Sequence, residues 1–124
     1  MDLNINWYNR DGEIIDTLAA NRLLGDPDYK RVALTEITSA SDSSVHHRVS
    51  TVWLGLDHSH TGGAPIIFET MVFEGGDTAQ EEWARRYSTE AEAEAGHAEI
   101  VTVIAATVAD EVITHLKRWP ENGA

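Results

Sequence analysis

The chain has 124 residues, 42% of them hydrophobic, and no cysteine; this length suits one domain, residues 1–124, with a buried core, and the composition argues against disorder. The absence of cysteine excludes disulfides, thiolate zinc sites and a cysteine nucleophile. Because 9 Lys and Arg stand against 21 Asp and Glu, the formal charge is −12, which opposes the attraction that drives general nucleic-acid binding.

The N-terminal segment predicts neither a signal peptide nor a membrane anchor. Residues 1–8 are mixed in character and are not preceded by positive charge, whereas a signal peptide has a basic start and an apolar stretch. No apolar run in the chain approaches the ~20 residues that span a bilayer. We therefore expect a protein that does not enter the membrane and is located in the cytoplasm.

The first predicted elements are a strand and a short helix. Residues 3–7 alternate between apolar and polar types, which is typical of a half-buried strand, and the Asp11-Gly12 pair that follows is a turn signal. Asp16 is a suitable N-cap for a short helix that runs to about Leu24, where Gly25 ends it.

Four further segments have the composition of strands, and they cover residues 31–38, 45–56, 65–73 and 83–88. Residues 65–73 are apolar on both faces, which predicts a central strand that is covered on both sides. Residues 83–88 are expected to form an edge strand. The connections between these segments are short enough for antiparallel hairpins.

A long C-terminal helix is predicted to begin at Thr89, because residues 89–92 fit a capping box, and to end at Arg118 or Trp119. Residues 100–109 carry no charge, so this part of the helix should be buried all round. Residues 100–104 also suit a strand, although their Ala/Glu-rich flanks favour a helix. The predicted fold is therefore α+β: an antiparallel sheet of about four to five strands, the long helix packed on it, and the short N-terminal helix.

The densest histidine cluster is Asp57-His58-Ser59-His60, and His46-His47 stands on the neighbouring predicted strand. In an extended chain His58 and His60 would point the same way, as a pair of metal ligands must. Glu69, Asp57 or His97 could then supply a third ligand. No His-Glu-x-x-His pattern supports this interpretation, so we expect solvated loop histidines, with no metal and no other cofactor.

Glu69 is a carboxylate on a predicted strand that is otherwise apolar. Such a group should have either a raised pKa or a cationic partner, and a perturbed carboxylate is a candidate for a functional site. The alternative that we favour is a structural hydrogen bond or ion pair with Arg48, Arg85 or a histidine.

Two strand motifs are distinctive, VSTVWLGLDH at 49–58 and PIIFETMVF at 65–73, and they are followed by RYSTE at 86–90 and AGH at 95–97. Together they resemble a family of small phage and prophage proteins, especially those of actinobacteria, over roughly residues 29–101. That family has no known activity, so the resemblance implies a phage context and no catalytic residues. Four residues match the family pattern and are the candidate ligand-binding residues: Asp57, His58, Glu69 and His97. His60 does not match it.

We therefore expect a non-enzymatic phage accessory protein in the host cytoplasm, which binds a host protein or sequesters a small ligand and so could counter host defence. One alternative is a small metal-dependent or acid–base hydrolase that uses His58, Glu69 and His97. Another is a minor virion component. The uncharged residues 100–109 also predict a homodimer through the C-terminal helix, unless the short helix at 16–24 covers the same surface.

Overall fold

The computed structural model describes residues 6–59, 62–75 and 80–117, with side chains of residues 80–83 excepted. Its helices and strands, in chain order, are β1 (Trp7–Tyr8), β2 (Ile14–Ile15), α1 (Thr17–Leu24), α2 (Pro27–Lys30), β3 (Arg31–Ser39), β4 (His46–Trp53), β5 (Phe68–Glu74), β6 (Gln80–Tyr87), α3 (Glu90–Ala105) and β7 (Glu111–Leu116). Strands β3 to β7 form one antiparallel sheet in the order β6-β5-β4-β3-β7, and β1 and β2 form a separate hairpin. The predicted α+β class with an antiparallel sheet is confirmed.

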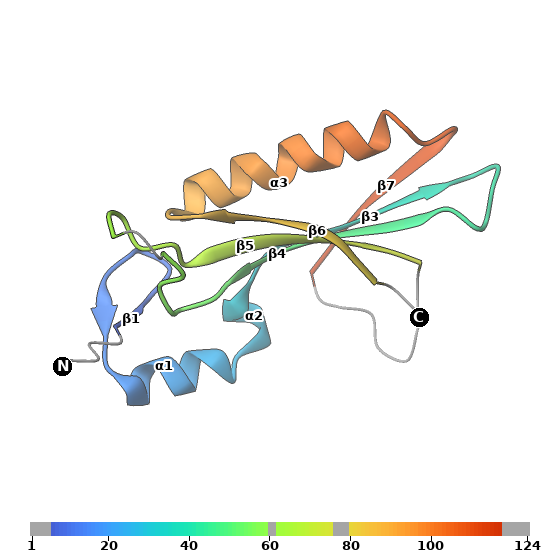
Figure 1. Ribbon diagram of the computed structural model, residues 1–124. Helices are drawn as coiled ribbons and strands as arrows, with labels where there is room; N and C mark the ends of the chain where they lie inside the picture. The colour runs from blue at the N-terminus through green and yellow to red at the C-terminus, as the bar shows by residue number, and fades with distance from the viewer. Residues whose placement is uncertain (1–5, 60–61, 76–79, 118–124) are drawn as a thin grey trace.

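The sheet separates the helices into two layers (Figure 1). Helix α3 lies along one face, whereas α1 and α2 lie beyond the other face, near one end of the strands. The main core forms where α3 meets the sheet, and it consists of Ile37, Val49, Val72, Ile100, Val101, Ile104, Ala105 and Val108. Because α1 lies on the opposite side of the sheet, it does not cover the outer surface of α3, which was one of the two predicted roles for it.

Both predicted helix starts are confirmed, and each has a local cause. The Asp16 side chain accepts the backbone N–H of Ala19 at 2.7 Å at the start of α1. At the start of α3, Thr89 and Glu92 form the complete capping box. Gly96 allows α3 to approach the sheet closely, because a Cβ at this position would lie 2.3 Å from the Tyr87 hydroxyl oxygen.

The predicted end of the C-terminal helix is wrong. Helix α3 ends at Ala105, and the chain turns through Asp110, which has a positive φ of 49°, into strand β7; the predicted end at residues 118–119 lies outside the described residues. The reason is a long-range one: β7, which contains three consecutive β-branched residues, pairs with β3 from Leu34 to Ser39. Nor is the uncharged segment buried all round, since Val103 is 60% exposed.

The strand predictions are correct in kind and differ in detail. β6 is an edge strand as predicted, but the central strand of the five is β4, and β5 lies between it and β6. Of the first predicted strand, residues 3–5 lie outside the described part of the chain, and its last residue, Trp7, is the first residue of β1. Among the described residues no helix is long and apolar enough to cross a membrane.

Candidate functional site

Side chains on the strands alternate between the α3 face and the opposite face of the sheet. On β4, Val49 and Thr51 face α3, since Val49 lies in the α3 core and Thr51 contacts a side chain of that helix. Ser50 and Val52 therefore belong to the opposite face. This alternation decides which of the predicted site residues can meet.

His97, the first predicted site residue, lies beneath α3 and is only 5% exposed. Its Nε2 lies 2.8 Å from Thr35 Oγ1 on β3, and its Nδ1 lies 2.7 Å from Thr51 Oγ1 on β4. The chain of hydrogen bonds continues from Thr51 to Thr70 on β5. At the other end, Thr35 Oγ1 lies 2.9 Å from Nδ1 of His115 on β7. This histidine–threonine network connects α3 with four of the five strands.

Burial, and secondarily the nearby His115, lower the pKa of His97 to about 4. The imidazole is therefore neutral at neutral pH, with one nitrogen donating a hydrogen bond and the other accepting one. Since both nitrogens are already bonded to threonine hydroxyls, the ring has no polar atom left for a ligand. We conclude that His97 anchors α3 to the sheet.

Glu69 lies on the opposite face of β5 and is 8% exposed. Its Oε2 accepts a hydrogen bond from Arg86 Nε at 2.8 Å. A cationic partner was expected for this carboxylate, but Arg86 was not among the three predicted partners. The β5–β6 register explains the choice, because it places Arg86 directly across from Glu69.

Asp57 and His58 lie at the start of the connection between β4 and β5. The Asp57 Oδ1 atom accepts the backbone N–H groups of Ser59 at 2.7 Å and Ile66 at 2.8 Å. The backbone N–H of His58 donates to the Ile66 carbonyl at 2.9 Å. The Asp57 carboxylate thus holds the two sides of this connection together, and the imidazole of His58 is half-buried.

The four predicted residues therefore do not form one site. Thr70 faces α3 and His97, so its neighbour Glu69 points to the other side of the sheet. A hydrolase that uses both Glu69 and His97 has no support in this geometry. His60, the second member of the proposed histidine pair, lies outside the described residues. Among the described residues no group of three or more His, Asp or Glu is placed to hold a metal ion.

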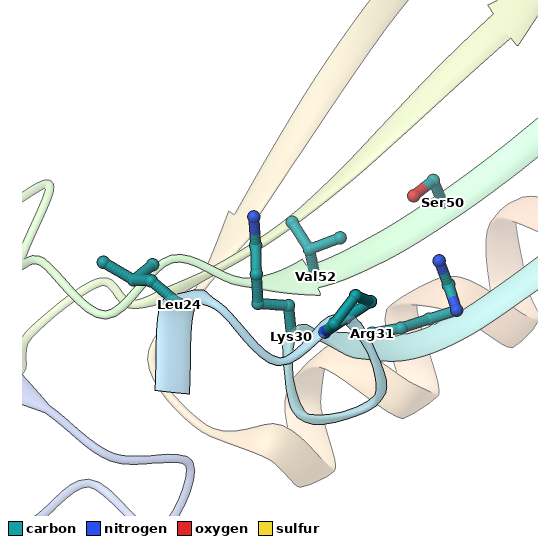
Figure 2. Close-up of a pocket in the computed structure, with 6 residues that line it drawn as sticks. Leu24, Lys30, Arg31, Ser50 and Val52 are labelled. Atoms are coloured by element: carbon teal, nitrogen blue, oxygen red, sulfur yellow. The ribbon is translucent and has the colours of Figure 1, made fainter. Parts of the chain in front are cut away.

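A different feature lies on the face opposite α3, where α1 and α2 approach the sheet. It is a hollow of about 200 Å³ lined by Leu24, Pro27, Lys30, Arg31, Ser50 and Val52. Figure 2 shows the Lys30 side chain extending towards Val52, while the charged end of Arg31 lies towards Ser50. We call this feature the Lys30–Arg31 hollow.

Local structure places the two cations at this hollow. Asp26 caps α2 by accepting the N–H groups of Asp28 and Tyr29, and Pro27 is at the start of the helix. Lys30 is consequently the last helical residue and Arg31 the first residue of β3. The β3–β4 register then sets Arg31 opposite Val52.

Lys30 and Arg31 differ from four of the arginines in their surroundings. Four arginines form ion pairs with carboxylates: Arg10 with Glu90, Arg48 with Glu36, Arg85 with Glu99, and Arg86 with Glu69. Within the described residues no carboxylate pairs with Lys30 or Arg31, and Arg31 Nη1 donates instead to the Lys117 carbonyl at 2.9 Å. The hollow therefore carries two positive charges that no described carboxylate neutralises, in a chain whose formal charge is −12.

The sequence contained one weak signal for this hollow, the adjacent Lys30-Arg31 pair, but two other basic pairs occur in the chain, at 85–86 and 117–118. No family model matches the chain, and neither curated proteins nor solved structures provided a match.

Proposed function

We propose that the protein is a non-enzymatic phage accessory protein that sequesters a small organic anion in the host cytoplasm. The phage context comes from the resemblance of the strand motifs. The observation that supports sequestration is the Lys30–Arg31 hollow, where two cations meet a hydroxyl and an apolar surface.

The lining of the hollow suits an anion with an apolar part. A carboxylate or phosphate group between Lys30 and Arg31 would receive charge-assisted hydrogen bonds, which are the stronger kind. The Ser50 hydroxyl adds one neutral partner, and Leu24 and Val52 offer apolar contact. The hollow is smaller than the pockets of about 300–1,000 Å³ that hold drug-sized ligands, which favours a compact molecule.

The same lining supports binding in preference to catalysis. The six residues of the hollow include no His, Asp or Glu, the side chains that most often act as a general acid or base. Ser50 is a hydroxyl with no histidine or carboxylate among the lining residues to activate it. A bound anion should therefore leave the protein chemically unchanged.

The test is capture of small molecules from a protein-free bacterial extract by the purified full chain, followed by mass spectrometry of the released compounds. We expect enrichment of an organic anion, recovered unchanged, that the Lys30→Gln/Arg31→Gln double variant does not retain. Arg22→Gln is the matched control, since Arg22 is exposed on α1, outside the hollow, and carries the same charge. Enrichment only of neutral compounds, or equal retention by the double variant, would contradict the proposal.

We also propose that the chain forms a homodimer, for which the C-terminal helix was the predicted contact surface. Support from α3 is limited to its outer face, where Val103 is 60% exposed and is the only large apolar side chain exposed on this helix. Ile100, Val101 and Ile104 already pack into the core. Val103→Glu tests the helix contact, because a buried charge would split the dimer.

A further inference from the structure

Strand β7 is an edge strand of the sheet, next to β3. Its outer edge pairs with no strand in the described part of the chain. Its first five residues are exposed, and two of them are large and apolar: Val112 is 44% exposed and Ile113 is 43% exposed. An edge of this kind presents a row of backbone donors and acceptors that can pair with another strand.

The opposite edge of the sheet is protected and β7 is not. Among its described side chains β6 carries two exposed charged residues, Arg85 and Arg86. Charged residues are a common means of preventing edge-to-edge association. β7 reads EVITHL, with one charge at its first position and no proline or glycine. If a second copy adds to this sheet, the β7 edge is the one that admits it.

We infer that β7 pairs antiparallel with β7 of a second copy about a two-fold axis at Thr114, which joins the two sheets into one of ten strands. This inference rests on the homodimer proposed above and locates its contact. Closed two-fold pairing is the commonest arrangement of soluble homo-oligomers. It also leaves no outer β7 edge in either copy.

The register of the pairing between the two β7 strands is specified by opposite charges. With Thr114 opposite Thr114, Glu111 of each copy lies opposite Lys117 of the other, the residue that directly follows β7. Val112 then lies opposite Leu116, and Ile113 lies opposite His115. Because residues two apart share a face of a strand, both members of every pair lie on the same side of the combined sheet. Opposite charges directly across an antiparallel pair are stabilising, whereas like charges are destabilising.

The neighbouring registers lack this match. A shift of two residues towards the start of the strand centres the axis on Ile113 and places Glu111 opposite His115. The reverse shift centres it on His115 and places Lys117 opposite Ile113. Neither forms the two symmetric Glu–Lys pairs, so the Thr114 register is the one that the sequence of residues 111–117 favours.

The test is sedimentation equilibrium of the full chain at micromolar concentration, where the wild type should approach twice its mass of 13.7 kDa. Glu111→Lys and Lys117→Glu each create two like-charge pairs and should weaken the dimer by about tenfold. The Glu111→Lys/Lys117→Glu double variant restores both pairs at the wild-type net charge and should recover the dimer. An equimolar mixture of the two single variants should form a heterodimer.

The outcomes separate this inference from the broader proposal. A monomeric wild type overturns both the homodimer and its location. A dimer that is unaffected by the single charge variants but split by Val103→Glu overturns the β7 contact and leaves the homodimer in place. Failure of the double variant to recover, with far-ultraviolet circular dichroism showing a folded chain, overturns the Thr114 register.

Discussion

The two faces of the sheet use their polar side chains in opposite ways. Beneath α3, His97 and its threonine partners satisfy one another within a closed network. On the other face, Glu69 pairs with an arginine that is 47% exposed in its side chain, and the Lys30–Arg31 hollow is open. Polar groups under α3 therefore contribute to stability, whereas the cationic side chains on the opposite face remain accessible to a ligand.

The largest expected effect comes from breaking the closed network. His97→Ala removes a buried ring and leaves the hydroxyls of Thr35 and Thr51 without their partner. The cavity and the unsatisfied groups should together lower the free energy of unfolding by about 3 kcal/mol, as measured by urea denaturation. His58→Ala is the matched control at a half-buried site outside the network, and a comparable loss there would contradict the comparison of the two faces.

The contrast also shows how far the sequence could predict this molecule. The helix starts at Asp16 and Thr89 were predictable because a cap depends on residues three apart. The end of α3 was not, because residues 100–109 contain no glycine, proline or charge, and the strand after them is defined by pairing with β3, more than 70 residues earlier in the sequence.

The predicted site residues followed the same division between local and long-range information. The need of Glu69 for a cation follows from its apolar strand, but the choice of Arg86 depends on the β5–β6 register. Sequence spacing had no signal for the His97 network, since Thr35 and Thr51 lie 62 and 46 residues from His97. The hollow likewise depends on tertiary placement of Lys30 and Arg31 beside Ser50.

A smaller effect should appear as a pH dependence of stability. The pKa of His97 is about 4 in the folded chain against 6.5 in a solvated imidazole. Between these values the unfolded state binds more protons than the folded state, so stability falls as pH is lowered through this window. The stabilising contribution is fully present above pH 6.5 and should decrease by about 2 kcal/mol by pH 5.

This dependence is measured by urea denaturation at a series of pH values. His97→Gln keeps a neutral amide in the network and does not titrate. Its unfolding free energy should therefore lack the part of the pH dependence that comes from His97. Carboxylates titrate mainly at the lower end of the same range and are common to both proteins. The relevant quantity is therefore the difference in unfolding free energy between wild type and variant. If this difference in unfolding free energy stays the same from pH 7 to pH 4, His97 is not the titrating group.

The smallest effect is expected on the accessible face, where Arg86→Gln removes the partner of Glu69. The carboxylate has a side chain that is only 11% exposed, but the guanidinium is 47% exposed, so water and salt already weaken the pair. Glutamine can still donate a hydrogen bond to the carboxylate, and the loss in unfolding free energy should therefore be under about 1 kcal/mol. Urea denaturation in low and high salt measures this loss. The difference in unfolding free energy between wild type and Arg86→Gln should decrease as salt is added. A loss of unfolding free energy as large as that of His97→Ala would contradict the comparison, because it would mean that polar contacts on this face stabilise the fold as strongly as the network beneath α3.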